Sequence, residues 1–174
     1  MKKIGILGGG VWGSALAKLL SNNNEVMIYA RDKKILSSIN EYRINPKLKY
    51  VIFNDNVKAT SDISKLKNYD YIFIALPTQS VREVINLYGK CEDKQNIIIG
   101  SKGIEITSQF FLYDVISSIT SAKNISVLSG PCFSNEVAQN LPTAVTLATK
   151  NKKIFNDINL LFNNNNFRLY YSND

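Results

Sequence analysis

The sequence contains no histidine, only two cysteines and no long apolar run. Cys91 and Cys132 alone are too few ligands for a common zinc site, so we expect no metal. Their wide separation predicts two free thiols, as in a reducing compartment. The longest apolar run, residues 71–76, has the length of a strand and falls far short of the roughly 18 residues of a membrane span. These absences argue against a zinc protein and against a membrane-spanning protein.

Acidic residues are also few, because 21 lysines and arginines face only 14 aspartates and glutamates, giving a net charge of +7. This balance favours an anionic partner: nucleic acid, an anionic membrane surface or a phosphorylated small molecule. The basic residues are scattered and form no stripe interleaved with aromatic residues, as an RNA-binding sheet would have. We therefore expect a phosphorylated small molecule and no nucleic acid.

The N-terminus imitates a secretory signal, because Lys2 and Lys3 precede an apolar stretch that ends in small residues at 14–17. Three consecutive glycines, Gly8 to Gly10, interrupt the helix that such a signal needs. We expect a cytoplasmic protein. Its 45% hydrophobic and 20% charged residues are typical of a globular domain.

Hydrophobic periodicity predicts alternating strands and helices. The expected strands are 2–8, 25–30, 57–60, 70–76, 96–101, 125–130, 143–149 and 166–171. The expected helices are 11–22, 33–42, 78–89, 108–119, 133–140 and 152–162, with a brief helical turn from residue 61 and an irregular stretch at 43–56. Continuously apolar strands in this alternation predict an α/β fold: a doubly wound, mostly parallel Rossmann-type sheet with helices on both faces. Ligands of such folds bind at the carboxyl ends of the strands.

Gly8, Gly10 and Gly13 form a GxGxxG motif between the first strand and the first helix. In a dinucleotide-binding turn, Gly8 allows the tight turn, Gly10 lets the pyrophosphate approach the backbone, and Gly13 lets helix and sheet pack closely. The amides at the helix start then bind the phosphates. A purely structural glycine turn is the alternative.

Arg31 and Asp32 end the second strand, where dinucleotide-binding folds contact the adenosine ribose. Arg31 is suited to a 2′-phosphate, which permits NADPH, whereas Asp32 is suited to the ribose hydroxyl of NADH. The alternative is a solvated surface pair that flanks the strand.

Later strand ends carry further candidates. Pro77 either crosses the path of the cofactor or simply stops its strand. Lys102 follows the next strand, where it is placed to pair with a substrate phosphate or polarise a carbonyl, unless it is an ordinary surface lysine. Cys132 resembles a nucleophile in its placement, but no histidine is present to activate it, so we expect no covalent catalysis.

The segments GGGVWGSALA, YARD, ALPTQSVREVI, GSKGIE and VLSGPCFSNEVAQNLPTAVTLAT resemble, in order and spacing, the N-terminal half of bacterial NAD(P)-dependent glycerol-3-phosphate dehydrogenase. The resemblance implies interconversion of sn-glycerol 3-phosphate and dihydroxyacetone phosphate with NAD(P)H, at the entry to phospholipid synthesis. It implies cofactor contacts at Val11, Trp12, Arg31, Lys102 and Ser134, and substrate contacts at Lys102, Gly130 and Cys132. The sequence departs from the family at Cys132, where serine or threonine is usual, and at Ser134, where alanine is common.

The resemblance also implies that the catalytic lysine, a general acid and base, lies in a second, all-helical domain. We therefore expect residues 1–174 to be the NAD(P)-binding domain, with the helical substrate domain beyond Asp174 and no catalytic acid or base in this chain. The expected protein partner is that half or, in a homodimer, a second copy. If the last helix and strand normally rest against that half, we expect the isolated chain to expose an apolar patch and to self-associate. The alternatives are a non-catalytic nicotinamide-dinucleotide sensor, a dehydrogenase with another hydroxy substrate, and a nucleic-acid binder.

Overall fold

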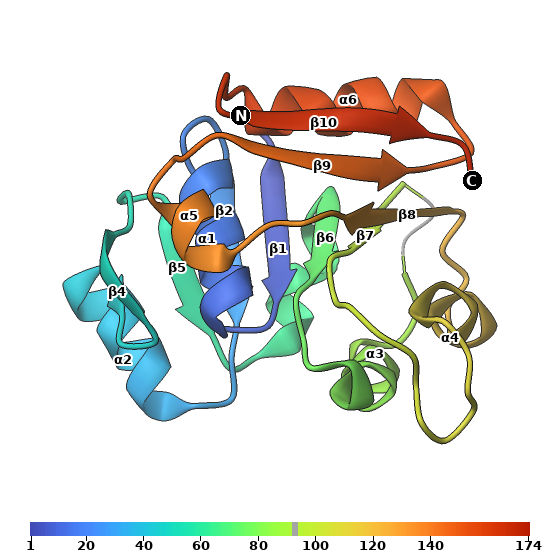
Figure 1. Ribbon diagram of the computed structural model, residues 1–174. Coiled ribbons are helices and arrows are strands. Elements are labelled where there is room, and N and C mark those ends of the chain that lie inside the picture. Colours follow the sequence, from blue (N-terminus) through green and yellow to red (C-terminus); the bar gives the residue numbers. More distant parts are fainter. Residues whose placement is uncertain (92–93) are drawn as a thin grey trace.

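The computed structural model describes residues 1–91 and 94–174, and within them an eight-stranded sheet carries helices on both faces (Figure 1). The strands of this sheet are β1 (Lys3–Leu7), β2 (Glu25–Tyr29), β5 (Val57–Thr60), β6 (Tyr71–Ile74), β7 (Asn96–Ile99), β8 (Asn124–Ser129), β9 (Thr143–Ala148) and β10 (Phe167–Ser172). The α-helices are α1 (Val11–Leu20), α2 (Lys33–Tyr42), α3 (Val81–Tyr88), α4 (Leu112–Ile119), α5 (Ser134–Ala138) and α6 (Lys152–Phe162). Two 3-10 helices, η1 (Ile63–Asn68) and η2 (Thr78–Ser80), complete the helical segments.

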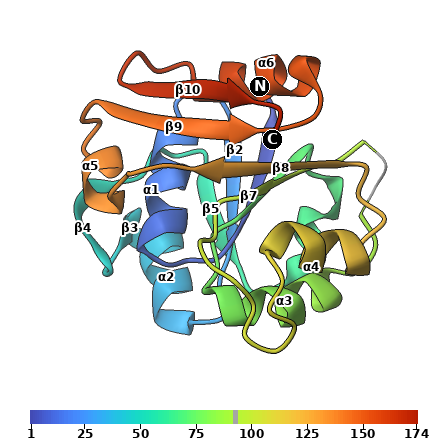
Figure 2. The same cartoon turned by 45° about the vertical axis from the view of Figure 1, so that its right-hand side comes forward.

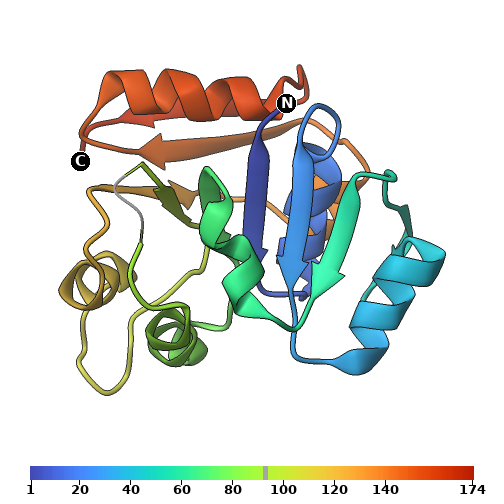
Figure 3. The same cartoon turned by 180° about the vertical axis from the view of Figure 1, so that it is seen from behind.

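The sheet has the strand order β10-β9-β8-β7-β6-β1-β2-β5. All neighbours from β5 to β8 pair in parallel, with Leu7 opposite both Tyr29 and Ile74. Their carboxyl ends therefore lie at one edge, as the arrowheads of β1, β2 and β5 show in Figure 3. This arrangement confirms the predicted doubly wound, mostly parallel sheet.

The last two strands reverse direction. β9 pairs antiparallel to β8, with Leu128 opposite Leu147, and β10 then pairs in parallel with β9. In Figure 1 both strands run across the end of the sheet at which β8 lies. The carboxyl ends of β9 and β10 consequently do not join those of the parallel strands β1, β2, β5, β6, β7 and β8.

Two apolar layers hold the sheet between the helices. Helices α1, α2, α5 and α6 contribute buried residues to one layer, whereas α3, α4 and η1 contribute to the other (Figure 2). The strands contribute side chains to both layers, and all four residues of β6 are buried. This two-sided burial explains why the strand sequences are continuously apolar. In the described parts of the chain, no helix is long and apolar enough to cross a membrane.

The stretch 43–56, expected to be irregular, contains a small antiparallel hairpin of β3 (Ile44–Asn45) and β4 (Leu48–Ile52). Leu48 and Val51 are buried in the layer that includes α1 and α2, which supplies the tertiary support that the short strands lack by themselves.

Four helices are shorter than expected: α1 ends at Leu20, α3 begins at Val81 after η2, and α4 and α5 are shortened as follows. Helix α4 begins at Leu112 rather than at residue 108, because Gln109 has a left-handed φ of 59° and Ser108 is engaged in loop hydrogen bonds. Helix α5 ends at Ala138, shortly before Asn140 with its left-handed φ of 60°. A residue in the left-handed conformation interrupts a helix; after glycine, asparagine and aspartate adopt this conformation most readily.

Asn24 joins two helices on one face of the sheet. Its buried amide donates to the carbonyl of Leu20 at 2.8 Å and to that of Leu161 at 2.9 Å. We predict that Asn24→Ala lowers the free energy of unfolding in urea by about 1–3 kcal/mol, because it leaves buried carbonyls unpaired. Asn23→Ala, at the exposed neighbouring position, is the matched control and should change it by less than about 0.5 kcal/mol. Equal effects of the two substitutions would contradict this account.

Candidate functional site

The candidate residues follow the carboxyl ends of neighbouring parallel strands. Gly8 follows β1, Arg31 follows β2, Pro77 follows β6, Lys102 follows β7 and Gly130 follows β8. Because these strands pair in aligned register, the structure gathers all five positions at one edge of the sheet. This is the edge at which open α/β sheets bind ligands.

The turn from β1 into α1 leaves no room for a side chain at Gly8 or at Gly13. Gly8 has a φ of 123°, and a Cβ there would lie 2.4 Å from the carbonyl oxygen of Ala75. A Cβ on Gly13 would lie 1.9 Å from the carbonyl oxygen of Gly8. These two glycines are therefore needed for the close contact between β1, α1 and the end of β6.

Gly10 has a different role from Gly8 and Gly13. It is the N-cap of α1 and has extended backbone, and a Cβ there would have no atom within 4 Å. No side chain caps the helix, and its first turn contains no acidic residue. The first amides of a helix have no partner within the helix and carry partial positive charge. The open space at Gly10 and the uncapped amides fit an approaching phosphate group.

Asn45 supports the glycine turn and was missed by sequence reasoning. Its buried Nδ2 donates to the carbonyl of Gly9 at 3.0 Å and to the Ser14 hydroxyl at 2.6 Å, while its Oδ1 accepts from the Lys47 amide. The hairpin that carries Asn45 therefore braces the turn from outside. The Asn-Pro pair at 45–46 signals a turn, but nothing in the sequence indicates which part of the protein that turn contacts.

Trp12 lies in the first turn of α1 and is half-buried. Its ring packs against the apolar layer that Cys132 also contacts, and its Nε1 is buried without a hydrogen-bond partner among the described residues. A Cβ on Gly100 would lie 3.0 Å from this Nε1. Gly100, directly after β7, is thus a second residue missed from the sequence: it makes room for the indole.

Arg31 and Asp32 are both engaged at the end of β2. The Arg31 guanidinium pairs with the carboxylate of Glu83 on α3 at 3.1 Å, and both side chains are mostly exposed. The Asp32 carboxylate caps α2 by accepting from the Lys34 amide at 2.9 Å. Arg31 is accessible to an anion that displaces Glu83, whereas Asp32 already has a structural role.

Hydrogen bonds link the carboxyl ends of β6, β7 and β8 near Pro77 and Lys102. The Ser101 hydroxyl donates to the Leu76 carbonyl at 2.7 Å and accepts from the Leu76 amide at 3.0 Å. The exposed Lys102 ammonium donates to the carbonyl of Gly130 at 3.1 Å. Lys102 therefore bridges two strand ends with its charge facing the edge of the sheet.

Cys132 and Ser134 lie in the connection that follows β8. Burial raises the pKa of the Cys132 thiol, although the nearby Lys102 ammonium opposes the shift, so the thiol is neutral near pH 7 and a poor nucleophile. Ser134 begins α5, which packs on α1. Within residues 1–91 and 94–174, no three His, Cys, Asp or Glu side chains gather in a way that would hold a metal ion.

A cavity of about 890 Å³ lies beside Lys102, away from the glycine turn. Apolar residues dominate its lining, including Ile104, Leu112 and Leu128. No residue of the glycine turn lines it, so the turn and this cavity are separate features, and Lys102 lines the cavity.

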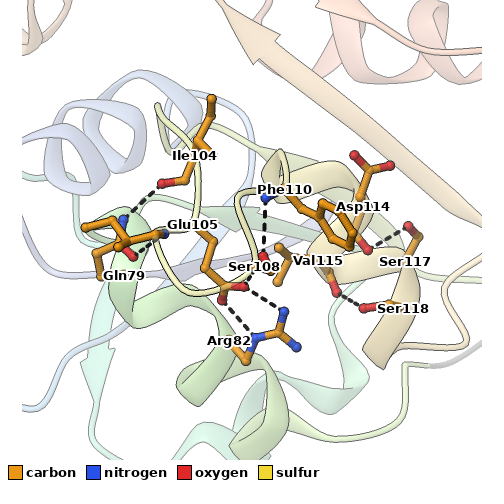
Figure 4. A network of polar contacts seen from close by, with 11 residues as sticks. Gln79, Arg82, Ile104, Glu105, Ser108, Phe110, Asp114, Val115, Ser117 and Ser118 are labelled. Atoms are coloured by element: carbon orange, nitrogen blue, oxygen red, sulfur yellow. Dashed lines mark hydrogen bonds and ion pairs between the residues drawn. The ribbon is translucent and has the colours of Figure 1, made fainter.

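Glu105, in the loop that follows Lys102, has a carboxylate that accepts three hydrogen bonds (Figure 4). Its side chain is 6% exposed and binds Arg82 of α3 through two hydrogen bonds, of 2.8 and 2.7 Å, and Ser108 through a third, of 2.6 Å. The Arg82 guanidinium and the Ser108 hydroxyl lower the pKa of Glu105 to about 2. No sequence motif indicates that residues 82 and 105 lie in contact.

Comparison with known proteins identifies the family. Residues 3–155 match the family described as NAD-dependent glycerol-3-phosphate dehydrogenase N-terminus. The chain belongs to this family. The NAD(P)+ glycerol-3-phosphate dehydrogenase of Zymomonas mobilis is 38% identical over 152 residues, which are 87% of this chain and 44% of the relative. The corresponding enzyme of Neorickettsia sennetsu is 38% identical over 156 residues, or 88% of this chain and 47% of the relative.

Solved structures of this family have the same fold. Glycerol-3-phosphate dehydrogenase from Coxiella burnetii has a TM-score of 0.89 at 30% identity, covering 99% of this chain and 54% of that one. The enzyme from Plasmodium falciparum has a TM-score of 0.91 at 25% identity, covering 99% of this chain and 53% of that one. The chain spans about half the length of the relatives it matches.

The glycine turn gives a paired prediction for stability. Gly13→Ala should lower the free energy of unfolding in urea by at least about 3 kcal/mol, because the new Cβ meets backbone that cannot move aside. Gly10→Ala should lower it by less than about 1 kcal/mol, the usual cost at an N-cap, because the space there is open. Similar losses for both variants would contradict the assigned difference between the two glycines.

The Arg82–Glu105 pair gives a prediction for pH dependence. The pKa of Glu105 is lower in the folded chain than its ordinary value of 4.5, so the pair stabilises fully above about pH 4.5 and loses its effect as the pH falls toward 2. The difference in urea midpoint between the natural chain and Glu105→Gln should therefore shrink from pH 6 to pH 2.5. Glu41→Gln, at an exposed position on α2, should change stability at pH 6 by less than about 0.5 kcal/mol. A difference that is constant over this range would be inconsistent with the lowered pKa.

Proposed function

We propose that residues 1–174 form the NAD(P)H-binding part of an oxidoreductase that interconverts sn-glycerol 3-phosphate and dihydroxyacetone phosphate, feeding phospholipid synthesis. The observation that carries this proposal is the glycine turn: Gly10 opens onto free space at the uncapped start of α1, in a chain of the glycerol-3-phosphate dehydrogenase family. Gly8 and Gly13 hold the turn in shape, while the amides from Val11 onward are placed to bind the pyrophosphate.

Both NADPH and NADH are proposed ligands. The Arg31 guanidinium is 61% exposed and is free to exchange Glu83 for a 2′-phosphate, which a planar guanidinium binds well. The ribose hydroxyl of NADH carries no charge to pair with a guanidinium, so NADH binding depends less on Arg31. Trp12, Pro77 and Ser134 complete the proposed cofactor contacts, with Trp12 and Ser134 placed on the packed pair α1 and α5.

Lys102 is proposed to contact both cofactor and substrate. Bound nicotinamide supplies or accepts the hydride of this reaction. The Lys102 ammonium lies at the Gly130 carbonyl and next to Cys132, so it offers a cation to a substrate phosphate or carbonyl at this point. Gly130 and Cys132 are the proposed neighbours of the substrate, with Cys132 acting as a small neutral side chain.

The proton-transferring lysine of the family is proposed to lie in a helical substrate domain outside residues 1–174. General acid-base catalysis is worth roughly 10²- to 10⁴-fold, and substrate positioning adds to it. We therefore expect residues 1–174 alone to turn over dihydroxyacetone phosphate far below ordinary enzyme rates. We propose the cytoplasm as the location, and the helical half or a second copy as the protein partner.

Trp12 is the only tryptophan, so its fluorescence reports on the proposed phosphate turn. We predict saturable quenching of Trp12 by NADPH and by NADH. Arg31→Ala should weaken NADPH binding by about tenfold, the loss of a charge-assisted contact, and NADH binding by less than about twofold. Gly10→Ala should weaken both, because its methyl group occupies the space proposed for the pyrophosphate.

The same titrations with dihydroxyacetone phosphate present separate the alternatives. An effect of this compound on cofactor affinity supports the dehydrogenase proposal, whereas cofactor binding that ignores it supports a dinucleotide sensor. Absence of quenching by either nucleotide in the natural chain would contradict the proposed cofactor site.

A further inference from the structure

Side chains of η2 and of the first turn of α3 bind the loop that follows β7; Figure 4 shows two of them, Gln79 and Arg82. The Thr78 hydroxyl donates to the Lys102 carbonyl at 2.5 Å. Directly after it, Gly103 has a left-handed φ of 123°, and a Cβ there would lie 3.1 Å from the same hydroxyl. The backbone on either side of Lys102 is therefore fixed against residue 78.

Two more side chains, Gln79 of η2 and Arg82 of α3, bind the loop further along. The Gln79 side chain donates from Nε2 to the backbone carbonyl of Ile104 at 3.0 Å. Its Oε1 accepts from the backbone amide of Ile106 at 2.9 Å. Arg82, one turn later, binds Glu105 through both oxygens of its carboxylate. Glu105 thus points back at α3 between two backbone positions that Gln79 binds.

Glu105 also organises the loop from inside. Its amide donates to the Phe110 carbonyl at 3.0 Å, its carbonyl accepts from the Gln109 amide at 2.8 Å, and its carboxylate accepts from the Ser108 hydroxyl. The loop 102–111 is thereby closed on itself and anchored to α3 by an ion pair in which the Glu105 carboxylate is nearly buried and Arg82 is partly exposed. No side chain in this network other than that of Lys102 reaches Gly130 through a hydrogen bond that the structure describes.

We propose that Arg82 and Glu105 are positioning residues: their ion pair fixes the loop so that the Lys102 ammonium is presented to cofactor and substrate at the carboxyl edge. This inference rests on the proposed function of Lys102. A lysine side chain is long and flexible, so a fixed backbone removes part of the entropy loss that its ligand contact would otherwise require. Small displacements of such a group weaken binding and catalysis strongly.

A double-mutant cycle distinguishes positioning from a merely structural pair. NADPH affinity is measured by Trp12 fluorescence for the natural chain, Glu105→Gln, Lys102→Gln and the double variant. If Glu105 acts through Lys102, Glu105→Gln weakens NADPH binding by about tenfold in the natural background but has almost no effect when Lys102 is already replaced. Independent, additive losses would overturn the proposal.

Arg82→Lys is the second variant, because it keeps the charge but not the two-pronged geometry, and it should reproduce the loss seen in Glu105→Gln. Asp55→Asn is the matched control, since it removes a carboxylate from the exposed ion pair with Arg43 in another part of the molecule. Its NADPH affinity should remain within about twofold of that of the natural chain. Circular dichroism checks that each variant is folded.

Limited proteolysis of the ligand-free chain tests the positioning without the cofactor. Trypsin should cleave after Lys102 several times faster in Glu105→Gln and in Arg82→Lys than in the natural chain or in Asp55→Asn. Unchanged cleavage in both Glu105→Gln and Arg82→Lys would overturn the proposal even if the chain bound no nicotinamide dinucleotide. Faster cleavage together with an absence of NADPH binding by the natural chain would instead contradict the proposed function alone.

Discussion

The candidate site depends on the close approach of helix α1 to strand β1. A single methyl group at Gly13 would collide with the Gly8 carbonyl, and one at Gly8 would collide with the end of β6. This contact directs the uncapped start of α1 at the carboxyl edge of the sheet, while Gly10 leaves space in front of it. The same backbone geometry therefore packs α1 against the sheet and leaves open space at the start of α1, where we propose that a phosphate group binds.

The aligned register of the parallel strands extends this arrangement across the sheet. It brings Arg31, Lys102 and Gly130 from separate strand ends to one edge. Side chains from outside the sheet then brace that edge: Asn45 holds the glycine turn, and the Arg82–Glu105 pair holds the loop of Lys102. The Asn45 amide and the Glu105 carboxylate are buried or nearly buried, so each depends on a nearly complete set of hydrogen bonds.

Much of the fold was predictable from the sequence, because buried parallel strands are continuously apolar and their glycine, proline and polar ends mark the edge of the sheet. The resemblance added family and candidate roles that periodicity cannot supply. The β3–β4 hairpin was not predictable, since its burial depends on α1 and α2, and neither was the reversal at β9. The start of α4 was misplaced because helical periodicity ignores the bonds between Ser108 and Glu105. Asn45, Gly100 and the Arg82–Glu105 pair were missed for one reason: their partners are distant in sequence.

The central claim is that a dinucleotide phosphate binds at the amides that follow Gly8. The most direct measurement is the change in amide ¹H–¹⁵N chemical shifts of the uniformly labelled chain on saturation with NADPH. The account predicts the largest changes at the amides of residues 9–13, with further changes near Arg31 and Lys102. Saturable binding that leaves residues 9–13 unperturbed and shifts amides around the apolar cavity or β10 instead would contradict it.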